Sequence, residues 1–403
     1  MNIKTSTRLY YLDWLRVIAI LTVFIYHSTR FFNLGDWHVK NPATYQSVEI
    51  FEKVVEVWMM PLIFVISGAS LFYAMDKVGT GKFIKDKVLR LLVPLVVCIF
   101  THATLQVYLE RLTHHQFYGS YFQFLPHYFD GFYMDVQEGG NFAWHGMHLW
   151  YLLFLFLFCM LFLPLFRWLK GSGKGILRGL GNFLGIPGMV YILALILILI
   201  EPVINGTFLD EIDPGGWSLG LYMGFFVLGF VIISHERLQN SIRRIRWLSL
   251  GLGVLIVAGY FSLVSNATNP VIIRLKEELD DPLASLASWF LILAFIGLGM
   301  QHLNFSRPFL KYANEAVLPF YILHQTVLLS LGYFVVQWHI PSLTKWLVIA
   351  SGSFVIIMGL YELYVRRNNI LRFLFGMKVI SKTIEVRAPE AQLEKAPRTA
   401  GTL

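Results

Sequence analysis

The sequence predicts an all-α fold: a polytopic membrane bundle of about ten transmembrane helices with both termini in the cytoplasm. Of its 403 residues, 56% are hydrophobic and only 14% are charged, whereas soluble globular domains average about 25% charged residues. Apolar runs of roughly 20 residues, the length that crosses a bilayer, recur along the whole chain. Backbone in lipid must satisfy its own hydrogen bonds, so we expect each run to form a helix.

Taken in order, the apolar runs define ten spans whose ends are approximate by a few residues. They cover residues 9–30, 54–75, 88–109, 149–169, 186–204, 216–234, 247–265, 284–303, 314–337 and 343–364. The third span is interrupted by Pro94, and the ninth contains Glu315, Pro319 and His324. We expect residues 1–376 to form the membrane domain and the polar segment 377–403 to be a disordered cytoplasmic tail.

The basic residues of the loops orient these spans. The loops that follow even-numbered spans hold most of them: Lys77, Lys82, Lys85, Lys87, Arg90, Arg167, Lys170, Lys174, Arg178, Arg237, Arg243, Arg244, Arg246, Arg307 and Lys311. The long third loop has only Arg111. Because cytoplasmic loops are enriched in Lys and Arg, both termini are predicted to be cytoplasmic. The formal net charge of +8 is therefore explained by topology, and we expect no nucleic-acid partner.

The first span carries ionisable residues, which are costly inside a bilayer and point to function. It contains Asp13, Arg16 and His27 and lacks a small-residue cleavage site, so it is not a signal peptide. Arg16 and His27 are eleven residues apart, which places them within about 20° of one helix face and roughly 16 Å apart along the axis. The simpler alternatives are an interfacial Arg16, paired with Asp13, and a His27 that merely ends the helix.

The run from Leu12-Asp13-Trp14-Leu15-Arg16 to Tyr26-His27 resembles the opening helix of the acyltransferase-3 family, in which Arg or Lys precedes His by ten intervening residues. A second match, Lys87-Val-Leu-Arg90, is similar to the RxxR element of that family, with Lys in place of the first Arg. Lysine keeps the charge but loses the bidentate geometry of guanidinium.

Shorter matches are Ile66-Ser67-Gly68, His148-Leu149-Trp150-Tyr151 and Tyr321-Ile322-Leu323-His324. The segment Trp37-His38-Val39-Lys40-Asn41, followed by the run Pro61–Gly68, looks like the branch that contains periplasmic glucan succinyltransferases. The resemblance covers essentially the whole chain.

The resemblance implies transfer of an acyl group from cytoplasmic acyl-CoA, such as acetyl-CoA or succinyl-CoA, to a hydroxyl at the outer face. The acceptor is expected to be a glycan or glycolipid, and no permanently bound cofactor or metal is expected. Lys87 and Arg90 would hold the CoA phosphates electrostatically. Arg16, also a candidate catalytic residue, would steer the CoA moiety or stabilise charge on it. His27 would act as the general base or, alternatively, form an acyl-imidazole.

Several residues are candidates for helping His27. Glu52 and Glu56 begin the second span on the outer side, where one of them could orient the imidazole. Trp37, His148 and His324 are candidate substrate-binding residues, although a lone His in mid-span more often makes an interhelical hydrogen bond. The aromatic third loop, about residues 110–148, suits either sugar stacking or an interfacial belt.

Two other functional classes remain open at this stage. In a secondary transporter, intramembrane Arg16, His27, Glu315 and His324 would form an ion pathway; a membrane scaffold or sensor would need no catalysis. We expect an integral protein of the bacterial plasma membrane whose partners are the bilayer, acyl-CoA and the acceptor. The oligomeric state is left open.

Overall fold

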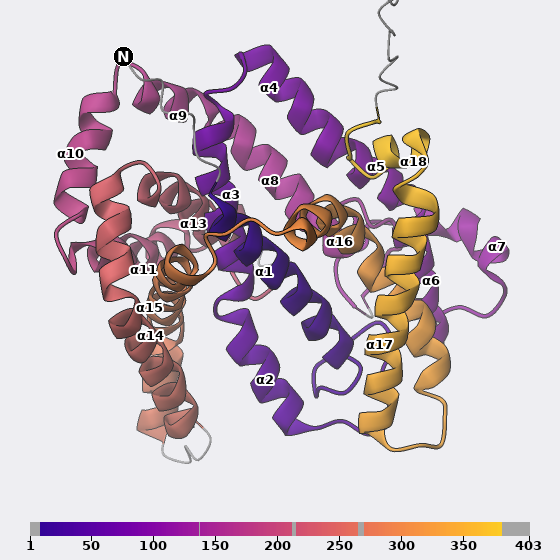
Figure 1. Ribbon diagram of the computed structural model, residues 1–403. Coiled ribbons are helices and arrows are strands. Elements are labelled where there is room, and N and C mark those ends of the chain that lie inside the picture. Colours follow the sequence, from indigo (N-terminus) through magenta and orange to yellow (C-terminus); the bar gives the residue numbers. More distant parts are fainter. Residues whose placement is uncertain (1–8, 137, 212–214, 265–269, 381–403) are drawn as a thin grey trace, which may run out of the picture.

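The structure of the chain, a computed structural model, describes residues 9–136, 138–211, 215–264 and 270–380. Helices joined by short loops form a bundle (Figure 1), and no β-strand occurs within the described residues beyond one isolated bridge between Phe132 and Phe142. The predicted all-α bundle is therefore confirmed. The predicted tail lies almost entirely outside the described residues.

Seven stretches are long and apolar enough to cross a membrane: Tyr10–Thr29 (α1), Gln46–Ala74 (α2 and α3), Thr80–Thr113 (α4 to α6), Glu236–Phe261 (in α14), Leu279–His302 (in α15), Pro308–Val335 (α16) and Ser342–Val365 (α17 and the π turn η5). Two bent pairs raise this number to nine. They are Met147–Leu161 with Leu163–Lys170, bent by 49°, and Lys174–Leu184 with Met189–Ile204, bent by 114°. The remaining predicted span, 216–234, coincides with the shorter apolar helix Leu219–Ile232 (α13).

The elements within these stretches and between them have the following bounds: α2 Gln46–Glu56, α3 Met59–Ala74, α4 Thr80–Lys87, η1 Val88–Leu92, α5 Val93–Phe100, α6 His102–Thr113, α7 Tyr121–Phe124, η2 Leu125–Phe129, η3 Met147–Leu149, α8 Trp150–Leu161, α9 Leu163–Lys170, α10 Lys174–Leu184, η4 Met189–Ile192, α11 Leu193–Ile204, α12 Phe208–Glu211, α14 Glu236–Val264, α15 Pro270–His302, α17 Ser342–Leu360, η5 Tyr361–Val365 and α18 Asn369–Leu374.

The two prolines noted in the sequence are accommodated in different ways. Pro94 is the second residue of α5 and follows the π turn η1. Proline has no N–H to donate to the carbonyl of Arg90, and a π turn is a common way for a helix to absorb such an interruption. Pro319 lies inside α16, which continues as one α-helix from Pro308 to Val335.

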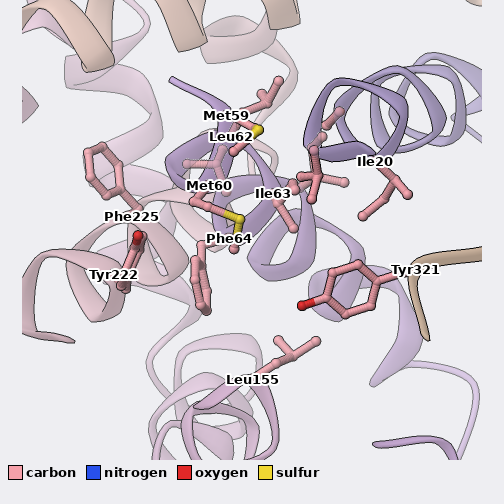
Figure 2. Packing of buried hydrophobic residues seen from close by; sticks show 14 of the residues in the cluster. Ile20, Met59, Met60, Leu62, Ile63, Phe64, Leu155, Tyr222, Phe225 and Tyr321 are labelled. Carbon is pink, nitrogen blue, oxygen red and sulfur yellow. The ribbon is translucent and has the colours of Figure 1, made fainter. Parts of the chain in front are cut away.

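The centre of the bundle is built on close contact between α3 and α13. A Cβ added to Gly68 would lie 1.9 Å from the Phe226 carbonyl oxygen, and one added to Gly229 would lie 2.1 Å from that of Val65. Only glycine allows this approach, which is typical of helix pairs in membranes. Beside it, Phe64 packs against Tyr222 of α13, with ring centroids 4.6 Å apart (Figure 2).

The bundle has two distinct ends. Figure 1 places α4, α9 and α18 at one end and α2, with the connection from α16 to α17, at the other. Lys82, Lys85, Arg167 and Lys170 belong to α4 and α9, so these basic residues share one end as predicted. That end is the one expected to face the cytoplasm.

Candidate functional site

A cavity of about 800 Å³ lies at the end of α1 that carries His27. It is bounded by α1, the loop after it, α2, the third loop, the start of α8 and α16; its lining includes Tyr26, His27, Arg30, Trp37, His38, Glu56, Tyr133, His145, His148 and Gln325. The loop after α1 is anchored by buried Phe31, Phe32 and Val39. It therefore forms a fixed wall over the end of the helix.

His27 is held by backbone and by a second histidine. Its Nδ1 lies 3.0 Å from the Val23 carbonyl oxygen and 3.1 Å from Nε2 of His324. Nδ1 of His324 lies 2.6 Å from the Tyr321 carbonyl oxygen. A carbonyl only accepts, so His324 carries its proton on Nδ1 and offers the Nε2 lone pair to His27. His27 is then protonated on Nδ1, which leaves its Nε2 unprotonated.

His148 completes a cluster of three imidazoles. Its Nε2 lies 3.2 Å from the carbonyl oxygens of Tyr321 and Ile322, and its ring centroid is 4.9 Å from that of His324. Its Nδ1 lies 3.4 Å from Nε2 of Gln106, which donates a stronger bond to Thr326. The structure thus brings together all three histidines singled out in the sequence, from α1, η3 and α16.

The two candidate orienting carboxylates have other partners. Glu52 accepts hydrogen bonds from Thr29 at 2.8 Å and Asn33 at 2.7 Å, and it lies 3.5 Å from the Arg30 guanidinium. Glu56 accepts from the Tyr26 hydroxyl at 2.5 Å. Within the described residues the contacts of the His27 ring nitrogens are with Val23 and His324, so a histidine occupies the position expected for an acid.

Trp37 covers one side of His27. The two rings are stacked, with centroids 5.5 Å apart and an interplanar angle of 24°. The Arg30 guanidinium lies 5.0 Å from the Trp37 ring. Nε1 of Trp37 and Nε of Arg30 are both buried and have no hydrogen-bond partner in the described part of the chain. Both residues line the cavity, and these two buried donors therefore lie just behind its surface.

A second buried network adjoins the first, and it joins residues that are far apart in the sequence. His38, 4% exposed, hydrogen-bonds through Nδ1 to Glu110 of α6, which is fully buried. Glu110 also accepts from the Tyr133 hydroxyl at 2.8 Å and pairs with Arg111 at 3.2 Å. Burial, with Glu110 nearby, raises the pKa of Tyr133 far above its usual range, so its hydroxyl remains a donor.

Gln325 connects the two networks. It directly follows His324 in α16, and its Nε2 lies 3.2 Å from Nε2 of His38. The Trp37 ring contacts both His27 and His38, and its centroid lies 4.5 Å from that of His38. His38 and His27 therefore face one cavity but have different partners, an anion and a neutral imidazole.

Arg16 lies near the opposite end of α1. It forms the expected pair with Asp13 at 3.1 Å and also donates to the Ser70 hydroxyl of α3 at 2.7 Å. One turn along α3, the Ser67 hydroxyl lies 2.7 Å from that of Tyr151. These groups place polar atoms of α3 and α8 between the two ends of the helix.

Lys87 and Arg90 lie on the helical stretch at the basic end of the bundle. Lys87 ends α4, and its Nζ is 5.5 Å from the Phe83 ring centroid. Arg90 is exposed on the π turn η1. A Cβ added to Gly376 would lie 2.6 Å from the Arg90 carbonyl oxygen, so the segment after α18 packs on this turn.

The aromatic third loop divides between core and surface. Phe124, Tyr128 and Tyr133 pack with Ala103 and Val107 of α6 in a separate buried cluster. Its most exposed aromatic rings are Tyr118, Phe122, Phe129 and Phe132. Part of the loop is therefore a structural cover over α6, and the rest is available to an interface.

Known proteins resemble the chain over nearly all of its length. The family model described as an acyltransferase domain, acyltransferase-3, matches residues 9–362. Glucans biosynthesis protein C of Escherichia coli O139:H28 (strain E24377A / ETEC) is 23% identical over 408 residues, covering 96% of this chain and 100% of that protein. Glucans biosynthesis protein C of Salmonella schwarzengrund (strain CVM19633) is 22% identical over 398 residues, covering 94% and 97%. No solved structure matches the chain.

Proposed function

The chain belongs to the acyltransferase-3 family, and from that premise we propose that it moves an acyl group from cytoplasmic acyl-CoA to a carbohydrate hydroxyl at the outer face. It is an integral bacterial membrane acyltransferase. The observation that carries the finer proposal is the geometry at His27: its Nδ1 lies against the Val23 carbonyl oxygen and His324, and its ring lines a cavity. From this geometry we infer a neutral imidazole whose Nε2 is the available base.

In the proposed reaction, Nε2 of His27 takes the proton of the acceptor hydroxyl while that oxygen attacks the thioester carbonyl carbon. The tetrahedral intermediate then loses CoA thiolate as the carbon–sulfur bond breaks, and the imidazolium returns the proton to sulfur. No proton is gained or lost overall. The Nδ1–H bond to His324 keeps His27 in the required tautomer throughout.

The charge that forms on the carbonyl oxygen needs donors that are fixed before the reaction begins. Trp37 Nε1 and Arg30 Nε are buried and have no partner among the described residues. The Trp37 ring stacks on His27, and the Arg30 guanidinium lies 5.0 Å from the Trp37 ring. We assign this role to them because an unpartnered buried donor is unfavourable unless a ligand completes it.

The donor would enter from the basic end of the bundle. CoA carries several phosphates, and Lys87 and Arg90 present cations at that end. Arg16, Ser70, Ser67 and Tyr151 then offer polar groups along the route to His27. The roughly 16 Å between Arg16 and His27 is short enough for the extended pantetheine arm.

A carbohydrate acceptor is proposed from two sources. The relatives that align over almost their whole length are named for glucan biosynthesis. The cavity is also rich in aromatic and polar side chains, a combination that suits sugars, with Tyr133, His145 and Glu56 in its wall.

The test uses the purified full-length chain in lipid nanodiscs, with radiolabelled acyl-CoA and a glucan acceptor. His27→Ala should abolish acyl transfer while its thermal unfolding midpoint stays at the wild-type value. His339→Ala, which removes an exposed histidine, is the matched control and should keep full activity. Full activity in His27→Ala would refute the proposed base. No binding of any acyl-CoA to the wild-type protein would refute the proposed donor.

A further inference from the structure

A second cavity, of about 470 Å³, lies where the start of α14 meets the end of α10. We propose that it binds the phosphate group of an anionic phospholipid. The proposal does not depend on acyl transfer, because the lining residues are separate from those of the His27 cavity. They include Gly185, Pro187, His235, Arg237, Ser241 and Arg244.

The lining is cationic. Arg237 and Arg244 are seven residues apart on α14, so they lie within about 20° of the same face, two turns apart. Both are exposed, and neither pairs with a carboxylate in the part of the chain that the structure describes. Glu236 is the single acidic residue of the lining, so one carboxylate stands against two guanidinium groups.

Two further features favour an anion. The cavity lies at the N-terminus of α14, a helix of 29 residues whose dipole attracts negative charge, although the Arg237 N–H is already bonded to Nδ1 of His235. Ser241, also in the lining, is 2% exposed, and its hydroxyl has no partner among the described residues. A phosphate oxygen would supply the acceptor that this hydroxyl lacks.

Glycines create the space between the two helices. A Cβ added to Gly181 would lie 2.4 Å from Cβ of His235, and one added to Gly185 would lie 2.7 Å from Cγ of Arg237. These glycines are four residues apart, so both lie on the face of α10 that approaches α14. The contact fixes Arg237 beside the Gly185–Pro187 turn, where the cavity opens.

The surroundings favour a lipid over a soluble phosphate. α10 is bent by 114° from the helix that follows it, and it exposes Ile176 and Phe183 as well as basic residues, as helices at a membrane interface do. Further along α14, Trp247, Leu248 and Leu255 are exposed, and only 11% of the residues in the most apolar stretch of this helix are buried. An acyl chain attached to a bound head group can therefore lie along α14.

The position of the cavity in the bundle also favours a lipid head group. Most of α10 and the start of α14 lie between the predicted spans, in loops whose Lys and Arg residues are predicted to be cytoplasmic. Basic pockets between transmembrane helices on that side are typical sites for anionic lipid head groups. Lys87 and Arg90, the residues proposed for CoA, lie on other elements, α4 and η1.

The experiment measures phosphatidylglycerol binding to the full chain in detergent, by native mass spectrometry and by the shift in thermal unfolding midpoint. Wild-type protein should bind phosphatidylglycerol and be stabilised by it. Phosphatidylcholine, whose choline cation cancels the phosphate charge, should stabilise the protein less. Arg237→Ala and Arg244→Ala should each weaken binding about fivefold. Arg178→Ala is the matched control, because Arg178 is an exposed arginine of the neighbouring helix α10 that does not line the cavity.

Three results would overturn the proposal. They are equal stabilisation by phosphatidylcholine, unchanged phosphatidylglycerol affinity in both variants, and stabilisation by inorganic phosphate or CoA but not by phosphatidylglycerol. If an alanine variant does not fold, Arg244→Gln keeps the length of the side chain without its charge and answers the same question. Acyl transfer is assayed separately, so loss of lipid binding with intact transfer separates this site from the His27 cavity.

Discussion

Glu110 gives the sharpest test of the buried polar network. Its carboxylate, fully buried, is shared by His38, Tyr133 and Arg111. Glu110→Leu removes the anion and leaves the Arg111 charge, whose side chain is 6% exposed, without its counter-ion. Breaking a buried ion pair costs about 3–5 kcal/mol. Arg111 keeps bonds to Asn141, Gln116 and Gly140, so we expect the lower end, about 3 kcal/mol of unfolding free energy.

Glu110→Gln should have a smaller effect. The amide keeps one acceptor oxygen and the shape of the side chain, so the cost is about 1–2 kcal/mol. The measurement is a reversible denaturant titration in mixed micelles, with wild type most stable and Glu110→Leu least. Glu138→Gln, in the exposed part of the third loop, is the control and should change stability by less than about 0.5 kcal/mol. A Glu110→Leu protein as stable as wild type would show that Arg111 is not dependent on this anion.

Three further outcomes are expected. His324→Leu removes one of the two acceptors near the His27 Nδ1–H and leaves the Val23 carbonyl oxygen, so it should lower kcat about tenfold at unchanged KM. His324→Gln keeps a side-chain acceptor and should retain most of the rate, and equal losses in the two variants would argue against a positioning role for His324. Gly229→Ala drives a Cβ to 2.1 Å from the Val65 carbonyl oxygen and should destabilise the protein by about 1–3 kcal/mol, whereas Gly251→Ala, with nothing within 4 Å, should not. Burial, with Arg30 nearby, lowers the pKa of Lys40 to about 8 from 10.5. Between these pH values the unfolded chain binds more protons than the folded one, so this residue makes stability rise with pH. Lys40→Met should flatten that rise in denaturant titrations at pH 8–10.5, and an unchanged slope would exclude Lys40 as its source.

The membrane spans could be predicted because each one depends on the composition of a single helix. Apolar length and charge deficit identify the spans, because crossing a bilayer requires about 20 apolar residues whatever the neighbours are. The basic loops identify the end that α4 and α9 share. Counting by length alone gives seven to nine spans, because α13 is short and two spans are bent. Bends of 49° and 114° arise from packing and loop geometry that a hydropathy pattern does not contain.

The site was predictable only where its residues share an element. Arg16 and His27 lie on α1, so helical geometry alone relates them. The pairing of His27 with His324 joins residues 297 positions apart, and that of His38 with Glu110 joins residues 72 apart. Glu110 is moreover just beyond the predicted end of the third span, where the simplest expectation for a carboxylate is solvent. In the structure it is fully buried, because α6 continues to Thr113 and the third loop covers it.

The choice of a histidine rather than an acid beside His27 has a physical explanation. A carboxylate at the end of α1 would favour an imidazolium, and a charged pair inside the bundle must repay a large desolvation cost. His324 fixes the tautomer with a neutral lone pair, so His27 remains an unprotonated base at no electrostatic cost. Glu52 and Glu56, which would otherwise compete for that role, are neutralised or bonded by Arg30, Thr29 and Tyr26. The two carboxylates are thus bonded to groups other than the imidazole, which is the arrangement that a general base working at neutral pH requires.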